Sequence, residues 1–314
     1  MNASKADAKK AKGPVKKLAF QGAPGCFGHL AGHLFCKLKM PELDRIRKEK
    51  TSDIKYTPCQ SYDEVVKAVV TGAVDFGILP LENSSVGTAI RSFELLSNNQ
   101  VALLADLFMP TRHCLIGLPG TNKQNIKRII SHPMALKQCR LYLSKQDNIE
   151  VRPYWDTAGA CFYIKRTQDA SVGAIAGEAA AQAAGLKVFE RNIDDFHSNE
   201  TRFGIISKID LAMGAVKAEF PDSPRLSCSV ELDRKQNDLS KFLKETLSPS
   251  QVELLNTISF PIAERPWEYI YILEIKVESN EETQAIWTKV RTNSAKARIL
   301  GIYESLKPIL DKAG

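Results

Sequence analysis

The strongest candidate for chemistry is a cluster of polar side chains that follows one apolar run. Residues 76–81 are almost all apolar, and Glu82, Asn83, Ser84 and Ser85 come directly after them. Amide, hydroxyl and main-chain donors close to the start of a helix are groups that hold a carboxylate. Asn and Ser are also favoured helix caps, but capping needs one such residue and this cluster has several. We therefore favour an anion-binding site over a purely structural cap.

A second cluster stands where a loop enters an apolar strand, in the run Asn199-Glu200-Thr201-Arg202-Phe203. The Arg202 guanidinium can hold a carboxylate through two parallel hydrogen bonds, and the Thr201 hydroxyl adds a further polar group. The alternative for Arg202 is an ordinary surface salt bridge, which would be the more common role if this run stood alone. We favour a carboxylate-binding role for Arg202 because other polar clusters accompany this one along the chain.

Two predicted strand-to-helix junctions carry further polar groups. Ser131 ends one apolar strand, Pro133 suits the first turn of the next helix, and Gln138 lies about two turns into it. Asp156 and Thr157 repeat that arrangement. Ligands of open α/β sheets bind beyond the carboxyl ends of the strands. We therefore expect these groups to face a crevice that they share with the first two clusters.

The usual signatures of cofactor and metal chemistry are missing from the sequence. There is no P-loop, no unbroken G-x-G-x-x-G and no evident Ser-His-Asp triad. His29 and His33 have a helical i, i+4 spacing, but they lack an intervening Glu and a nearby third ligand. We therefore predict no cofactor and no metal, and a reaction on a small polar acid.

The composition is that of an ordinary globular protein with a basic start. The chain has 314 residues, of which 44% are hydrophobic and 25% charged, and no run approaches the roughly 20 apolar residues of a membrane helix. Lysines concentrate in residues 1–15, which we predict to be a disordered solubilising tail. Such a tail can also bind nucleic acid, but aromatic interleaving is absent. We expect neither a nucleic-acid nor a membrane partner, and a cytoplasmic location, because no secretory or transit signal is evident.

The cysteines indicate packing rather than cross-linking. Their number is odd, no two form a C-x-x-C pair, and most stand in apolar surroundings. We expect them to be reduced, buried side chains in a reducing compartment.

The elements that must position these residues alternate between strand and helix through residues 16–210. Alternation of this kind predicts an α/β architecture with mostly parallel sheets. Strands are expected at 17–21, 75–81, 101–108, 113–118, 126–131, 151–155, 172–176 and 202–207, and helices at 27–38, 61–72, 133–145, from 156 onward, and at 177–184.

A change of composition marks a predicted linker at residues 211–224, which contains Gly214, Pro221 and Pro224. The order of elements after it is strand, helix, strand, strand, helix, strand, the ferredoxin-like βαββαβ plan. The expected strands are 226–232, 252–262, 269–277 and 299–304, and the helices are 238–247 and 282–292. Residues 225–314 are therefore predicted to form a separate C-terminal domain.

Taken in chain order, these segments resemble the prephenate dehydratase family, including its plant-type arogenate dehydratase branch. The likeness covers roughly Leu18 to Ser207. The matching motifs are Gly22-Ala23-Pro24-Gly25-Cys26-Phe27-Gly28, the run from Asp75 to Ser84, His113-Cys114-Leu115, Ser131-His132-Pro133, Gln138-Cys139, Thr157-Ala158 and Asn199-Glu200-Thr201-Arg202-Phe203. Each motif alone is weak, whereas the whole series in family order and spacing is strong.

The resemblance implies a catalytic region of two lobes, like that of periplasmic solute-binding proteins, around a cleft. The implied reaction is the decarboxylating dehydration of prephenate to phenylpyruvate in phenylalanine biosynthesis. Arogenate dehydration to phenylalanine is the alternative, and a non-catalytic acid-binding sensor is a more distant one. Carried over residue by residue, the catalytic residues are Thr201, Asn83 and Gln138, and the substrate-binding residues are Glu82, Ser84, Ser131, Thr157, Arg202 and Phe203. The family also implies a homodimer or homotetramer, and no cofactor.

The C-terminal domain resembles the ACT regulatory domain, which binds phenylalanine in this family. Its two phenylalanine-binding motifs are degraded here. The helix start reads Asn237-Asp238-Leu239 in place of Gly-Ala-Leu, and the strand reads Ile258-Ser259-Phe260-Pro261 in place of Glu-Ser-Arg-Pro. We predict that the domain keeps a role in subunit pairing but binds phenylalanine weakly or not at all. In the glycine-rich turn, Gly28 stands where many relatives carry a hydroxyl, which predicts a reduced or altered substrate contact.

Overall fold

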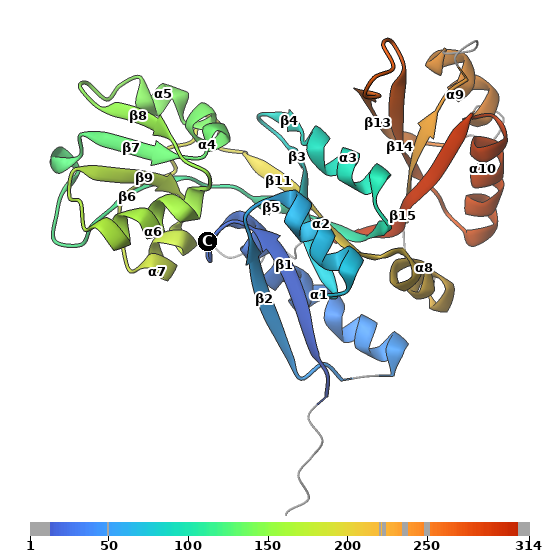
Figure 1. Cartoon of the computed structure of the whole chain (residues 1–314), viewed down its shortest axis with the longest axis horizontal. Coiled ribbons are helices and arrows are strands. Elements are labelled where there is room, and N and C mark those ends of the chain that lie inside the picture. The colour runs from blue at the N-terminus through green and yellow to red at the C-terminus, as the bar shows by residue number, and fades with distance from the viewer. Residues whose placement is uncertain are drawn as a thin grey trace, which may run out of the picture.

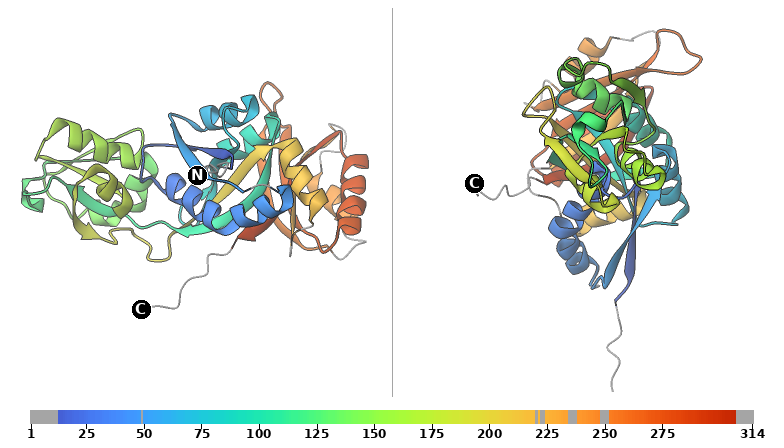
Figure 2. Two further views of the ribbon diagram at one scale, coloured as in Figure 1. Left: turned by 90° about the horizontal axis from the view of Figure 1, so that it is seen from below. Right: turned by 90° about the vertical axis from the view of Figure 1, so that its left-hand side faces the viewer.

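The computed structural model describes residues 13–48, 50–219, 221, 224–233, 238–247 and 252–306. They form two α/β lobes and a C-terminal unit, which follow one another along the long axis of the molecule (Figure 1). Figure 2 shows the same succession from below. Most of the predicted basic tail, residues 1–12, lies outside the described residues.

Lobe 1 is built on the strands that carry the first two polar clusters. Strand β1 runs parallel between β2 and β3, and β11 runs antiparallel between β3 and β5. All residues of β11 except its two ends are buried. The strands are β1 (Val15–Gln21), β2 (Asp53–Cys59), β3 (Phe76–Asn83), the short β4 (Gly87–Thr88), β5 (Val101–Pro110) and β11 (Glu200–Lys208), and the helices are α1 (Phe27–Arg47), α2 (Tyr62–Thr71), α3 (Ile90–Asn98) and α8 (Ile209–Ala218).

Lobe 2 is a five-stranded sheet in the order β10-β6-β9-β7-β8. Strands β9, β7 and β8 are parallel to one another, whereas β6 runs antiparallel to both of its neighbours, β9 and β10. The strands are β6 (Cys114–Gly117), β7 (Arg128–Ser131), β8 (Glu150–Pro153), β9 (Val172–Ala176) and β10 (Lys187–Arg191). The helices are η1 (Lys123–Asn125), α4 (Pro133–Gln138), α5 (Arg140–Leu143), α6 (Thr157–Thr167) and α7 (Glu178–Ala184).

The chain passes between the lobes twice, and this explains why β5 and β11 depart from the predicted parallel pattern. It leaves lobe 1 after β5 and returns through β11. Because a strand that returns beside the strand that left must run the opposite way, β5 and β11 are antiparallel. The two crossing segments are joined by a hydrogen bond from the Thr111 backbone N–H to the Asn199 carbonyl, at 2.9 Å.

Several predicted elements differ from those in the structure. The edge strands β2 and β10 were not predicted, because their exposed, charged side chains break the apolar pattern of a buried strand. The helix predicted at 27–38 continues to Arg47. The helix predicted at 133–145 is two short helices that meet at Cys139.

The C-terminal unit has the predicted βαββαβ order. It consists of β12 (Arg225–Glu231), α9 (Leu239–Leu247), β13 (Leu254–Pro261), β14 (Tyr269–Lys276), α10 (Asn280–Thr292) and β15 (Lys296–Leu306). Its sheet order is β13-β14-β12-β15. Phe242 of α9 and Ile286 of α10 belong to one buried cluster with Leu226 and Leu273 of the sheet. The helices therefore cover one sheet face with an apolar core.

The C-terminal unit is continuous with lobe 1 rather than tethered to it. Strand β15 pairs in parallel with β5, so that one sheet runs through both units. Helix α8 occupies the first part of the predicted linker. Its Ala212 is buried in the core shared by the lobes, and its Met213 and Val216 pack against the core of the C-terminal unit. Gly214 is tolerated inside this helix because tertiary packing on both sides outweighs its low helix propensity.

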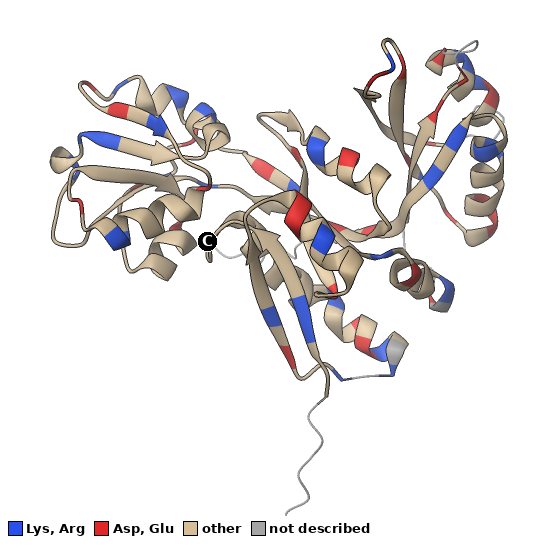
Figure 3. Ribbon diagram, viewed as in Figure 1, with Lys and Arg blue, Asp and Glu red and all other residues tan. Residues whose placement is uncertain are grey.

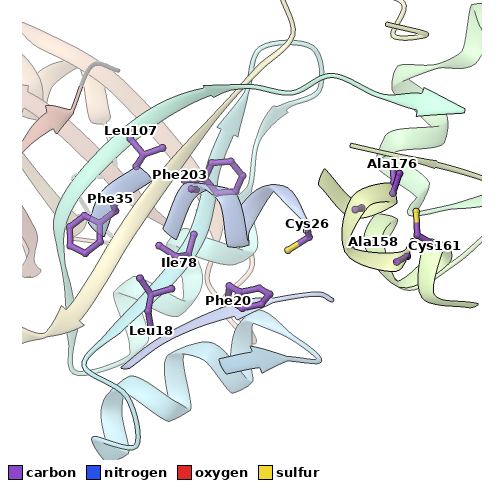
Figure 4. Packing of buried hydrophobic residues seen from close by; sticks show 14 of the residues in the cluster. Leu18, Phe20, Cys26, Phe35, Ile78, Leu107, Ala158, Cys161, Ala176 and Phe203 are labelled. Atoms are coloured by element: carbon purple, nitrogen blue, oxygen red, sulfur yellow. The ribbon is translucent and has the colours of Figure 1, made fainter. Parts of the chain in front are cut away.

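The buried core also explains the cysteines. All seven are free thiols, and six of them are buried; only Cys36 is partly exposed. Figure 4 shows Cys26 on the side of lobe 1 that faces Ala158 and Cys161 of lobe 2. These three residues belong to one apolar cluster that draws on both lobes.

Charged residues of both signs are interleaved along the ribbon of all three units (Figure 3). Among the described residues, no helix combines the length and the apolar character that crossing a membrane requires.

Candidate active site

A cavity of about 330 Å³ lies between the two lobes. Lobe 1 contributes the ends of β1 and β3 and the starts of β11 and α1, whereas lobe 2 contributes α4 and the start of α6. Thr111 lines the cavity where the chain crosses between the lobes. Residues that are far apart in the sequence are therefore brought to one shared cavity.

The Asn83 side chain, at the end of β3, is the centre of the polar network in this cavity. Its Oδ1 accepts hydrogen bonds from the backbone N–H groups of Ser85 and Val86, at 3.0 and 3.2 Å. Backbone N–H groups can only donate, so this end of the amide must be the oxygen. The Nδ2 group therefore faces the other way and donates to Asn199 Oδ1 at 2.8 Å and to Thr201 Oγ1 at 2.9 Å.

Thr201 lies opposite Asn83 across the β3–β11 ladder, 118 residues away in sequence. Its Oγ1 accepts a hydrogen bond from Asn83 and lies 2.7 Å from the Thr111 hydroxyl. When Thr111 donates to it, both lone pairs of the Thr201 oxygen are occupied. The Thr201 proton is then left to donate to a group bound in the cavity. Thr201 is 8% exposed, so that donation takes place away from bulk water.

Gln138 of α4 joins lobe 2 to this network. Its Nε2 donates to Asn83 Oδ1 at 3.0 Å, so its Oε1 faces His113 Nε2 at 2.7 Å. Because an amide oxygen only accepts, His113 Nε2 must carry the proton. Burial lowers the pKa of His113, and the imidazole is therefore neutral near pH 7. The lobes are held together across the crevice by a chain of directed hydrogen bonds.

Helix N-termini supply the positive potential that an anionic substrate requires. Helix α1 begins at Phe27 after Cys26, and α6 begins at Thr157 after Asp156, and all four residues line the cavity. N–H groups in the first turn of a helix have no partner within the helix, and the helix dipole favours negative charge there. No Lys or Arg is found among the described residues that line the cavity. Carboxylates must therefore be held by amides and hydroxyls.

Two acidic residues, Glu82 and Asp156, are also among those that line the cavity. Asp156 Oδ2 accepts hydrogen bonds from the backbone N–H groups of Ala23 in lobe 1, at 2.9 Å, and of Gly159 in lobe 2, at 2.8 Å. Burial raises the pKa of Asp156. A Cβ atom at Gly22 would lie 2.8 Å from this carboxylate, so the glycine permits the lobes to meet here.

The structure brings together six of the nine residues expected to act on or bind the substrate. Asn83, Gln138 and Thr201 form the hydrogen-bonded network, and Glu82, Thr157 and Phe203 line the same cavity. The Gly28 position also lines it, and a Cβ there would come no closer than 3.9 Å to a neighbouring atom. A side chain at residue 28 would therefore fit without strain.

Three of the expected substrate-binding residues are not among those that line the cavity. Ser84 is exposed, and its hydroxyl accepts from the Glu200 backbone N–H at 2.9 Å. Ser131 is fully buried and donates to the Ile175 carbonyl at 2.5 Å.

The third, Arg202, lies between two cavity-lining residues but has no place in the cavity. Successive side chains of a strand point to opposite faces, so Thr201 and Phe203 face the cavity and Arg202 faces away. Its guanidinium is 3% exposed and is bound to Asp106 and Glu274. The expectation that Arg202 clamps a substrate carboxylate is therefore corrected.

Sequence reasoning missed two further contributors to the site. Thr111 contacts Thr201, and Asn199 accepts from Asn83. Asn199 belongs to the same polar run as Thr201, and this position in the sequence could have identified it as part of the site. Thr111 follows directly after β5 and carried no signal of its own, because its role depends on how the two crossing segments pair.

The sequence profile of the prephenate dehydratase family matches residues 18–210. The chain belongs to the prephenate dehydratase family. Its matched region covers both lobes, from β1 to the start of α8.

Curated relatives divide between two names. Arogenate dehydratase 1 of Petunia hybrida is 32% identical over 62% of this chain and 43% of its own length. Arogenate dehydratase 3, chloroplastic, of Arabidopsis thaliana is 27% identical over 91% of this chain and 66% of its own length. A bifunctional chorismate mutase/prephenate dehydratase of Enterobacter agglomerans is 24% identical over 92% of this chain. The chain thus spans less than two thirds of the length of the first two relatives.

Solved structures confirm the fold. Prephenate dehydratase from Arthrobacter aurescens, in complex with L-Phe, matches with a TM-score of 0.74 at 21% identity, over 92% of this chain and 90% of that one. A protein described as a novel type of quorum quenching acylase, GqqA, also matches with a TM-score of 0.74 at 24% identity, over 93% of this chain and 98% of that one. At these identities the likeness shows the fold alone.

Proposed function

We propose that this protein converts prephenate to phenylpyruvate by loss of water and carbon dioxide, in phenylalanine biosynthesis. The observation that carries the proposal is the meeting of Thr201, Asn83 and Gln138 in one cavity between the lobes. Membership of the prephenate dehydratase family supports it.

The reaction needs little from the protein beyond binding and one proton donor. The bond between the ring and its carboxylate breaks, and its electron pair enters the ring as carbon dioxide leaves. The ring hydroxyl departs from the opposite carbon while its oxygen accepts a hydrogen bond, and it becomes water with a proton that comes from solvent. An aromatic ring remains. Thr201 is placed to donate a hydrogen bond to that departing oxygen. General acid assistance of this kind contributes typically about 10²–10⁴-fold, and amides at the starts of α1 and α6 hold the carboxylates.

The hydroxyl of Thr201 is the first part of the proposal to test. Thr201→Ala is expected to lower kcat on prephenate by about 10²–10⁴-fold, because the donor to the departing oxygen is lost. Thr201→Ser should keep most of the activity, and the measurement is the rate of phenylpyruvate absorbance. Ser84→Ala is the control, since that hydroxyl lies outside the cavity lining. A wild type inactive on both prephenate and arogenate would instead support a non-catalytic sensor, and an unaffected Thr201→Ala would remove Thr201 from the mechanism.

A second candidate substrate is arogenate, which carries an ammonium group where prephenate has a keto group. The observation that favours it is the charge of the cavity, whose described lining includes the Glu82 and Asp156 carboxyls and no basic side chain except His132. Burial lowers the pKa of His132, so this group is uncharged near pH 7. A carboxylate at Glu82 would attract the ammonium of arogenate and repel a second carboxylate.

Glu82 should therefore distinguish the two substrates. Glu82→Gln is expected to lower kcat/KM for arogenate about tenfold or more, since a hydrogen bond to a charged group contributes about 1.5–3 kcal/mol, and to spare prephenate. Steady-state assays of both substrates side by side provide the measurement, with Glu200→Gln as a control carboxylate outside the cavity lining. Equal losses for both substrates, or a wild type that does not convert arogenate, would contradict this role.

We further propose that the C-terminal unit binds phenylalanine weakly or not at all. Ile258 and Phe260, which stand where the family has Glu and Arg, are 6% and 4% exposed and share a buried cluster with Leu95 and Leu96 of α3. They pack against lobe 1 instead of forming a polar ligand site. Between them Ser259 is exposed, as is Pro261, while Leu239 begins α9; Asn237 lies outside the described residues.

Titration calorimetry of the whole chain with phenylalanine measures this directly. We expect no binding, or a dissociation constant in the millimolar range, and unchanged dehydratase activity on adding phenylalanine. Tight binding accompanied by loss of activity would contradict the proposal. A homodimeric or homotetrameric state and a cytoplasmic location stay predictions.

A further inference from the structure

Strand β11 has a second face that the proposed reaction does not use. Thr201 and Phe203 line the cavity, whereas Arg202 between them points to the opposite face and into the C-terminal unit. The ladder between β11 and β3 has a register shift between Arg202 and Phe203. An irregularity of this kind re-aims side chains and interrupts strand pairing. The backbone next to Thr201 is therefore held less regularly by β3 than the rest of the strand.

Arg202 compensates through four directed hydrogen bonds. Its Nε donates to Asp106 Oδ2 at 2.6 Å, and its two Nη groups donate to the two carboxylate oxygens of Glu274 at 2.7 and 2.6 Å. Nη2 also donates to the Tyr303 hydroxyl at 3.1 Å. The paired contact with Glu274 fixes the guanidinium in orientation as well as in position. Asp106 belongs to lobe 1, but Glu274 and Tyr303 belong to the C-terminal unit.

Glu274 is itself fixed by the other strands of that unit. The Tyr303 hydroxyl of β15 donates to its Oε1 at 3.0 Å, and Asn256 Nδ2 of β13 donates to its Oε2 at 3.3 Å. Ser227 of β12 lies 2.9 Å from the Tyr303 hydroxyl. Burial and the neighbouring Glu274 raise the pKa of Tyr303 well above its usual value, so the phenol keeps its proton. All four strands of the unit thus contribute to one rigid receptor for Arg202.

Burial makes this network sensitive to each of its members. Asp106 and Glu274 are 0% and 1% exposed, and Arg225, with a side chain 24% exposed, lies 3.9 Å from Asp106. Two acids and two guanidinium groups therefore balance in charge. Removing one member would leave a buried charge without a partner, which is strongly unfavourable. The network has one preferred arrangement, and that arrangement also fixes β11.

We propose that Glu274 and Tyr303 are positioning residues for the dehydration, which act through Arg202 to hold the Thr201 hydroxyl at the cavity. This inference rests on the proposed function. In it, the C-terminal unit completes the catalytic lobe of its own chain, independently of any regulatory ligand. Neither residue touches the substrate, so substrate affinity is not their direct contribution.

A double-mutant cycle on the full-length protein tests this. Glu274→Gln is expected to lower kcat at least tenfold and to change KM less than threefold, because binding groups on α1 and α6 stay in place. In a Thr201→Ala background most of this effect should disappear, since the hydroxyl that Glu274 positions is already absent. Tyr303→Phe, which keeps every charge, should lower kcat by about threefold or more with the same dependence on Thr201. If near-ultraviolet circular dichroism shows that Glu274→Gln does not fold, the Tyr303→Phe variant provides the test instead.

Glu253→Gln is the matched control, because Glu253 is an exposed acid of the same unit that pairs with Lys276 3.2 Å away. It should leave kcat unchanged. A folded Glu274→Gln or Tyr303→Phe protein with full kcat would overturn this inference and leave the proposed function untouched. So would equal losses in the wild-type and Thr201→Ala backgrounds, which would indicate a general loss of structure. A wild type inactive on both prephenate and arogenate would overturn the proposed function as well.

Discussion

Two backbone N–H groups, those of Ser85 and Val86, determine which end of the Asn83 amide faces Thr201. They hold the amide oxygen, so the nitrogen must donate toward β11, and Gln138 must in turn present its own nitrogen to Asn83. The direction of the hydrogen bonds through Gln138, out to the protonated Nε2 of His113, follows from that first constraint, and the Thr201 proton is free when the Thr111 hydroxyl donates to Thr201. The site can therefore offer a Thr201 proton to its ligand without any charged partner for that threonine.

The cavity combines this directed network with the N-termini of helices α1 and α6. Its described lining has no guanidinium or ammonium group, so negative charge must be met by helix N-termini and hydroxyls. Such groups are fixed by the backbone and do not need to reorganise as charge moves during the reaction, which is the condition for electrostatic stabilisation of a transition state. The guanidinium of Arg202, next in sequence to Thr201, is used elsewhere, in the hydrogen bonds with Glu274. One strand thus serves chemistry on one face and rigidity on the other.

The sequence was sufficient for the fold class and for the residues that form the central network. Asn83, Thr201 and Gln138 stood in recognisable motifs, strand-helix alternation predicted an α/β architecture, and the family resemblance implied the two lobes. The site error at Arg202 has a physical cause, because the direction of a side chain depends on strand pairing and not on its neighbours in sequence. Arg202 has partners 96 and 72 residues away, which no local pattern reveals. Helix α8 was likewise taken for a linker, since its stability comes from packing against both flanking units.

The central claim is that the departing ring hydroxyl meets the Thr201 side chain within the cavity between the lobes. A crystal structure of the Thr201→Ala protein with prephenate bound tests this most directly. We predict the ring hydroxyl beside residue 201 and Asn83, in the space vacated by the threonine oxygen, and at least one carboxylate at the first turn of α1 or α6. Prephenate bound outside this cavity, or with its ring hydroxyl directed away from β11, would contradict the account.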